Sequence, residues 1–219
     1  MSYSWVMASL DEFRPKQSRA VVTVNSLLDA AIEEIETLGE DGVRVETVLE
    51  KAGVSIGSLY HHFGGREQLI EAARVEQLRR FHTDDLNAIQ MLLSGIISVE
   101  DLLDRLTLMS QAFHDPNGGD TRLRRLALLG SAVTRDALLA TTRDARQKTN
   151  QILIDVFQDL KDRRILSEQA DPATITLFIQ AFSFGQVLAD IDGISPDPEY
   201  WANLSKKLVL MVMDLVEPI

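Results

Sequence analysis

The sequence predicts an all-α protein, with an N-terminal three-helix domain at residues 17–64 and a larger helical domain at residues 65–219. Every strong apolar pattern along the chain has the helical spacing of three or four residues. None of these patterns alternates as a half-buried β-strand does. Glycine, proline and N-capping residues stand between the patterns and divide the chain into separate helices.

The first two helices are predicted from apolar spacing and from the glycines that follow it. At residues 19–38 apolar side chains recur at steps of three and four as far as Leu38, and Gly39 offers a C-terminal stop. Residues 45–52 repeat the pattern over two turns, and Gly53 interrupts it. Two helices of unequal length therefore precede position 54.

A third, short helix is predicted to begin after Ser55, which is a favourable N-capping residue. A helical wheel places Ile56, Leu59 and Phe63 together on the inward face. The glycine pair at 64–65 ends the helix after about two turns.

The remaining patterns predict helices from Arg66 onward, at 98–114, 121–131, 136–164, 171–190 and 198–216. The last two are apolar on more than one narrow stripe, so they need cover on two sides. A homodimer formed through these two helices supplies that cover. The alternative is that both are central helices of a monomer.

Composition excludes several classes of protein. The 219 residues include no cysteine, which excludes disulfides, thiolate metal sites and cysteine nucleophiles and suits a reducing cytoplasm. The N-terminal residues lack a secretory signal pattern, and no apolar run approaches the ~18 residues of a membrane span. We therefore expect a cytoplasmic protein without a membrane partner.

The net charge of −11 argues at first against a nucleic-acid partner, which is held through Lys and Arg. Over residues 42–66, however, the balance is slightly positive, with three basic side chains against two acidic ones. Local charge governs a contact surface, so DNA remains a possible partner.

The stretch AGVSIGSLYHHF at residues 52–63 fits two motifs. GVSIG matches the nucleophile elbow of hydrolases, which requires a buried strand before the serine. Here a charged helical pattern precedes Ser55, so we interpret this serine as a helix cap and predict no enzyme activity. The other motif is a helix-turn-helix, in which the outward face of the second helix enters the major groove of DNA. Gly57 and Ser58 on that face are small enough to allow close approach.

The same stretch, followed by GGREQLI, resembles the tetracycline-repressor (TetR) family of bacterial regulators over about residues 17–74. The resemblance implies a helix-turn-helix DNA-binding domain and a C-terminal domain for effector binding and dimerisation. It implies a DNA-binding transcriptional regulator, a repressor by the family's usual action, that a small-molecule ligand releases from its operator. Its partners would be double-stranded operator DNA, an unknown effector and a second copy of the chain. The DNA-facing residues would be Ser55, Ile56, Gly57, Ser58, Tyr60 and His61, with Arg66 on the phosphate backbone.

The chain departs from the family pattern at positions where other members often contact phosphate. Arg44 and Val45 stand where a capping threonine or serine is common, and Ile56 replaces a common lysine. Arg44 can replace one phosphate contact electrostatically, so we include it among the DNA-binding residues. The alternative function is a helical protein-interaction module of this fold that has lost DNA binding. Arg14, Lys16 and Arg19 belong either to a minor-groove arm or to a solvated tail.

No cofactor and no metal site are predicted. His61 and His62 point about 100° apart on a helix, and no nearby carboxylate completes a ligand set. Aromatic, Met and His side chains of the middle helices are candidates for an effector pocket. These candidates are Phe81, Met109, Phe113, His114, Phe157, Phe178 and Phe182.

Overall fold

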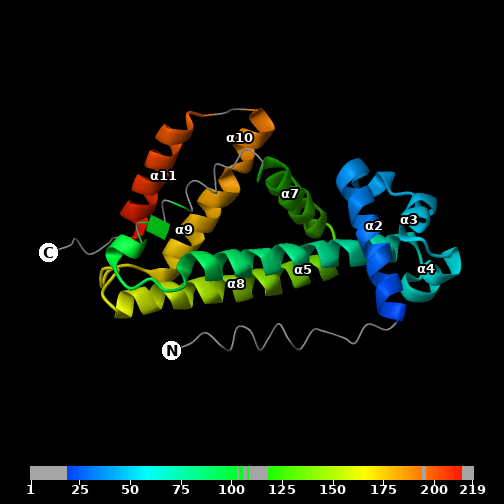
Figure 1. Cartoon of the computed structure of the whole chain (residues 1–219), viewed down its shortest axis with the longest axis horizontal. Coiled ribbons are helices and arrows are strands. Elements are labelled where there is room, and N and C mark those ends of the chain that lie inside the picture. The colour runs from blue at the N-terminus through cyan, green and yellow to red at the C-terminus, as the bar shows by residue number, and fades with distance from the viewer. Residues whose placement is uncertain (1–18, 103, 106–107, 109–117, 194–195, 214–219) are drawn as a thin grey trace. The chain divides into compact units, whose positions relative to one another are not determined.

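The computed structural model describes residues 19–102, 104–105, 108, 118–193 and 196–213 (Figure 1). Within these ranges the regular elements are helices, and no strand is formed. The all-α prediction is therefore confirmed. The ligand candidates Met109, Phe113 and His114 lie outside the described residues, as do Arg14 and Lys16.

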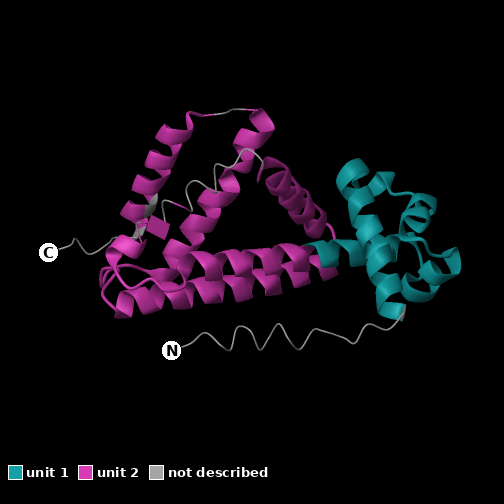
Figure 2. Ribbon diagram, viewed as in Figure 1, with its two compact units in different colours: residues 1–77 teal, residues 78–219 magenta. Residues whose placement is uncertain are grey.

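The helices form two compact units, residues 1–77 and residues 78–219 (Figure 2). Helix α5, Arg66–Leu93, contributes residues to both units. Its first turns bury Leu69 and Ala73 in the core of unit 1. The boundary given by the contacts thus falls inside α5, whereas the sequence pattern places it just before that helix begins.

Unit 1 is built from α2 (Arg19–Gly42), α3 (Val45–Ala52), α4 (Ile56–Phe63) and the start of α5. The predicted stop at Gly39 is present as a break in helical geometry, with φ 73° and ψ 172°. Leu38 is exposed and does not continue the buried stripe, because the regular turns of α2 end beside it. The core of unit 1 includes Leu27, Ala31, Ile35, Val48, Leu59, Leu69 and Ile70.

Unit 2 contains the rest of α5 and five further labelled helices among the described residues (Figure 1). Helix α8 contacts α7 and α9, α10 contacts α7 and α9, and α11 contacts α9. Phe157 and Leu160 of α8 are buried at the centre of one apolar cluster. The helices are α7 (Gly119–Val133), α8 (Asp136–Asp162), α9 (Pro172–Gly185), α10 (Val187–Asp192) and α11 (Pro198–Met213).

Two predicted helices differ in detail from the structure. The predicted helix at 171–190 is two helices, α9 and α10, separated at Gln186. Asp171 caps α9 as expected, and hydrogen bonds from Thr174 lower the pKa of its carboxyl group. Of the helix predicted at 98–114, residues 99–102, 104–105 and 108 are helical, and the remainder lies outside the described residues.

The segment Pro172–Asp192 is apolar enough, with a mean hydropathy of 1.3, and long enough to cross a membrane. The sequence pattern had indicated no such run, because polar residues interrupt it. A helix that packs in a protein core or against another subunit passes the same test, so the segment alone does not indicate a membrane protein. Only 22% of its most apolar window is buried within the chain.

Candidate functional site

The turn between α3 and α4 is held by a glycine in a conformation that other residues rarely adopt. Gly53 has φ 65° and ψ 34°, and its N–H donates to the carbonyls that end α3. Ser55 then caps α4, and its side-chain oxygen accepts a hydrogen bond from the Ser58 N–H at 3.3 Å. The predicted helix, tight turn and second helix are therefore present, and Ser55 acts as a helix cap.

Helix α4 presents one buried face and one solvent-exposed face. Leu59 is fully buried in the core of unit 1, whereas Tyr60 is 58% exposed and His61 is also exposed. Ile56 is 54% exposed. The wheel that placed Ile56 inward is wrong, because this first residue of α4 lies beyond the edge of the core. Ile56 therefore lies on the exposed side of α4, and its contact with DNA stays a prediction.

Gly57 lies in the first turn of the exposed face of α4. A Cβ atom built on it would meet only the Ser55 hydroxyl oxygen, at 3.8 Å. Nothing in the described fold therefore requires a glycine at this position. What its small size does allow is close approach of another surface to the helix backbone.

The three basic side chains of residues 42–66 have different surroundings. Lys51 donates to Glu33 at 2.7 Å and lies 2.8 Å from Glu34, and these hydrogen bonds raise its pKa. Arg44 is exposed and forms no side-chain hydrogen bond or ion pair with any described residue. Of these cations, Arg44 is thus the one that no acidic side chain of the described chain neutralises.

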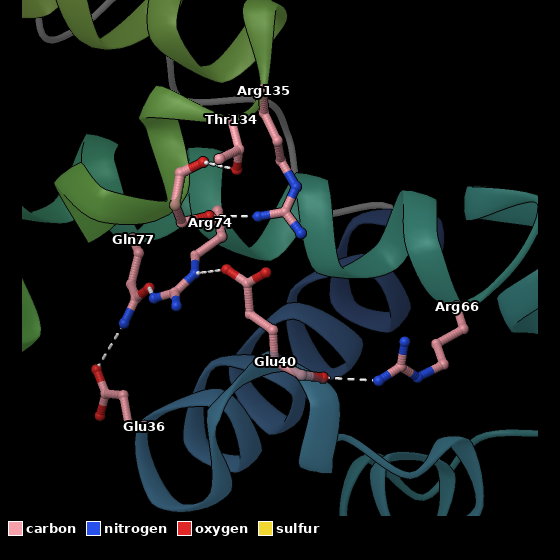
Figure 3. Close-up of polar contacts among 8 residues, drawn as sticks. Glu36, Glu40, Arg66, Arg74, Gln77, Thr134 and Arg135 are labelled. Carbon is pink, nitrogen blue, oxygen red and sulfur yellow. Dashed lines mark hydrogen bonds and ion pairs between the residues drawn. The ribbon is translucent and has the colours of Figure 1, made fainter. Parts of the chain in front are cut away.

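Arg66 is bound to backbone carbonyl groups of its own unit (Figure 3). Its Nε donates to the Val43 carbonyl at 3.0 Å, and a terminal nitrogen donates to the Glu40 carbonyl at 2.6 Å. A third bond, of 3.3 Å, reaches the Asp41 carbonyl. These bonds tie the start of α5 to the end of α2, so Arg66 has a structural task that the sequence pattern did not indicate.

We predict that Arg66→Gln lowers the free energy of unfolding by about 1–3 kcal/mol, because the carbonyls lose charged hydrogen bonds. Urea unfolding measures this loss. The slope of log DNA affinity against log salt should stay unchanged, because Arg66 is bound to carbonyls and makes no phosphate contact. Removal of a residue that contacts phosphate would lower the slope by about one. Arg44→Gln is the matched control and should lower the slope without loss of stability. An unchanged stability with a lowered slope for Arg66→Gln would assign it to phosphate instead.

A second candidate site is a cavity of about 330 Å³ inside unit 2, between α5, α7, α8 and α9. The predicted residues Phe81 and Phe157 line it. Phe178 and Phe182 do not; their rings stack 6.4 Å apart, and Phe182 also stacks on Trp201. The other apolar lining residues are Leu78, Ala88, Ile89, Leu92, Leu93, Leu128, Leu129, Ala145, Leu153, Ile179, Phe184 and Val187.

The cavity also has polar lining residues that the aromatic pattern did not indicate. His82 on α5 shares a 2.9 Å hydrogen bond with the Thr149 hydroxyl on α8, and burial lowers the pKa of this histidine. Such residues become visible only once the helices are placed together. The polar set comprises His82, Asp85, Arg122, Arg125, Thr142, Arg146, Thr149, Asn150, Gln180 and Ser183.

Two of the lining arginines are paired with carboxylates. Arg125 binds Asp85 at 2.6 Å, and its guanidinium lies 4.8 Å from the centre of the Phe81 ring. Arg122 binds both carboxylate oxygens of Asp190 at 2.6 Å, which lowers the pKa of that carboxyl. Among the described residues, no three His, Asp or Glu side chains converge in the manner of a metal site.

Comparison with known proteins adds to this geometry. The model of the family "Bacterial regulatory proteins, tetR family" matches residues 27–73, which include α3 and α4. An uncharacterized HTH-type transcriptional regulator of Mycobacterium tuberculosis is 23% identical over 186 residues, which is 85% of this chain and 90% of that protein. The A-factor receptor protein of Streptomyces griseus is 37% identical over 62 residues, covering 28% of this chain and 22% of the receptor.

Solved structures of similar fold extend over nearly the whole chain. A TetR-family transcriptional regulator from Cytophaga hutchinsonii superposes with a TM-score of 0.70 at 15% identity, covering 93% of this chain and 100% of that one. A proposed transcriptional regulator from Saccharomonospora viridis, solved in complex with choline, gives 0.66 at 16% identity, covering 89% and 98%. At these identities the likeness concerns the fold.

Proposed function

Because the chain belongs to the TetR family of bacterial transcriptional regulators, we propose that it is a cytoplasmic, homodimeric repressor that a small molecule releases from its operator. The observation that carries the proposal is the exposed face of α4, which is unobstructed within unit 1 and carries small and hydroxylated residues. DNA binding and transcriptional regulation are general to the family. Repression, ligand release and the residue roles are our proposal for this chain.

In the proposed complex α4 lies in the major groove of DNA. Tyr60 and His61 donate to phosphates or base edges, and Gly57 lets the helix backbone come close. Arg44, at the start of α3, supplies the uncompensated charge for a phosphate. Ser55 chiefly fixes the helix, and Ile56 makes an apolar contact such as one with a thymine methyl group.

An apolar stripe along α9 and α10 supports the proposed dimer. Leu177, Phe184, Leu188 and Ile191 are all exposed, and their spacings of seven, four and three residues place them on one helical face. Exposed apolar residues on adjacent helices mark a surface that another protein covers. A second copy covers it through the same surface, giving an isologous four-helix contact that includes Met211 on α11.

We predict that Leu188→Glu weakens dimerisation by at least about tenfold, because the interface would bury an unpaired charge in each subunit. Leu188 is 63% exposed in the single chain, so its replacement leaves the core of unit 2 intact. Analytical ultracentrifugation measures the dissociation constant. Val133→Glu, which changes a 72% exposed apolar residue on α7, is the control that should leave the dimer unchanged. A wild-type protein that sediments as a monomer would contradict the proposed interface.

Release follows from the placement of the cavity in the same helices as the proposed dimer surface. Phe184 lines the cavity and also belongs to the exposed stripe. A ligand that fills the cavity favours one arrangement of α9 and α10. It thereby favours one distance between the two α4 helices of the dimer. DNA affinity then falls when that spacing no longer matches successive major grooves. The choline-bound structural neighbour gives precedent for a small molecule in this fold.

Transcription in vitro tests repression directly. Purified protein is added to polymerase and a template carrying the promoter upstream of its own gene. The proposal expects fewer transcripts as protein is added, with an unrelated promoter unaffected. Increased transcription would make the protein an activator and contradict the proposed repressor.

A further inference from the structure

The charged residues of the unit 2 cavity leave one positive charge uncompensated. The lining contains three arginines and one aspartate, Asp85, and Asp190 outside the lining binds Arg122. Of the described residues at this cavity, three arginines and two aspartates give a net charge of +1. His82 does not alter this sum near neutral pH, because burial lowers its pKa. The cavity therefore favours a negatively charged group over a positively charged one.

The uncompensated charge belongs to Arg146 on α8, which is exposed to solvent. Its guanidinium donates to the side-chain carbonyl of Gln180 at 2.8 Å, and no carboxylate among the described residues pairs with it. Gln180 in turn donates its amide to the Asn150 carbonyl at 2.7 Å. That bond orients the Asn150 side chain, whose amide nitrogen is a second hydrogen-bond donor beside Arg146. Arg146 and Asn150 are four residues apart, hence on one face of α8.

The carboxylate of the lining and one of its aromatic rings, Asp85 and Phe81, are already paired with a cation. A quaternary ammonium ion is held by aromatic faces and carboxylates. Here Arg125 lies over the Phe81 ring and also binds Asp85. The remaining apolar lining residues are aliphatic except Phe157, which is buried, and Phe184, which is exposed.

We propose that this cavity binds an apolar molecule carrying one acidic group, whose carboxylate pairs with Arg146 and Asn150. The apolar part of the ligand lies against the leucine and phenylalanine side chains of α5 and α8. The inference rests on the proposed function, because it identifies this cavity as the effector site. It narrows the effector to weak organic acids of a size that about 330 Å³ can hold.

Three probes with the same alkyl chain separate the head groups: octanoate, octan-1-ol and octyltrimethylammonium. Isothermal titration calorimetry of the full-length protein near neutral pH should show octanoate binding about tenfold more tightly than octanol, as a charged hydrogen-bonded pair provides. Octyltrimethylammonium should bind most weakly. Arg146→Gln should lower octanoate affinity about tenfold and leave octanol affinity unchanged. Arg143→Gln, an exposed charge on the same helix outside this cavity, should change none of the three.

Equal affinity for octanoate and octanol would overturn the proposal, as would unchanged octanoate binding by Arg146→Gln. Tightest binding of octyltrimethylammonium would replace it with a cation site. DNA binding by the same protein preparations is measured before any probe is added, by fluorescence anisotropy. DNA binding that persists while head-group selectivity is absent refutes the acidic ligand alone. Failure of the ligand-free wild-type protein to bind DNA refutes the proposed function instead.

Discussion

Replacing Gly57 by glutamate should lower the affinity for DNA by about a thousandfold or more, without lowering the free energy of unfolding. The new carboxylate would face phosphates from the exposed side of α4, and like charges in contact cost several kcal/mol. In a dimer this repulsion occurs twice, once at each α4 helix. Stability is preserved because the space beyond Gly57 is open and an acidic residue in the first helical turn is favourable. Fluorescence anisotropy and urea unfolding measure the two quantities.

Two further variants serve as controls. One adds a side chain of the same size without a charge, and the other adds the same charge at a different helical glycine. Gly57→Gln has the size of the glutamate variant without its charge and should lose less affinity. Gly130→Glu changes another helical glycine, on α7, whose added Cβ also meets no atom within 4 Å. It should leave DNA affinity within about twofold, since a distant added charge is screened. Unchanged affinity for Gly57→Glu would remove α4 from the DNA interface.

The largest loss of stability is expected from Glu40→Gln, at about 3 kcal/mol. Arg74, which is 6% exposed, donates its Nε to the Glu40 carboxylate at 2.7 Å (Figure 3). A second guanidinium nitrogen donates to Gln77 at 2.8 Å, and Gln77 donates to Glu36 at 2.9 Å. Removing the Glu40 charge leaves a buried guanidinium without its carboxylate, which is costly in a core. Urea unfolding of the full chain measures the loss.

A double-mutant cycle with Arg74→Met tests this cause. The methionine keeps much of the apolar volume and removes the charge that Glu40 balances. The double variant should therefore be more stable than the sum of the two single losses implies, with a coupling of about 2 kcal/mol. Additive losses would show that Glu40 and Arg74 stabilise unit 1 independently.

Local signals in the sequence predicted the framework of the proposed DNA-binding surface correctly. Gly53, Ser55 and the glycine at 64 each act within a few residues of their own position, so their effects are readable without a fold. The apolar spacing located α3 and α4 for the same reason. The extent of α5 was harder to predict, because Arg66–Leu93 carries many charged residues and only a weak apolar stripe.

Contacts between distant residues could not be predicted in this way. Arg66 is paired with carbonyls of Glu40 and Val43, and Lys51 is paired with Glu33, across separations of 18 to 26 residues. A local charge count had treated Lys51 and Arg66 as available cations. The polar wall of the cavity was missed for the same reason, since His82 and Thr149 meet only when α5 and α8 pack together.

Binding to the intergenic DNA upstream of its own gene tests the central claim most directly. Fluorescence anisotropy at about 50 mM and 200 mM salt, with unrelated DNA as competitor, separates specific from electrostatic binding. We expect the protein to retain tight binding to the upstream DNA at the higher salt, with a shallow salt dependence, because few of its cations are available. Binding no tighter than to unrelated DNA at either salt would contradict the account and favour a protein-interaction module of this fold.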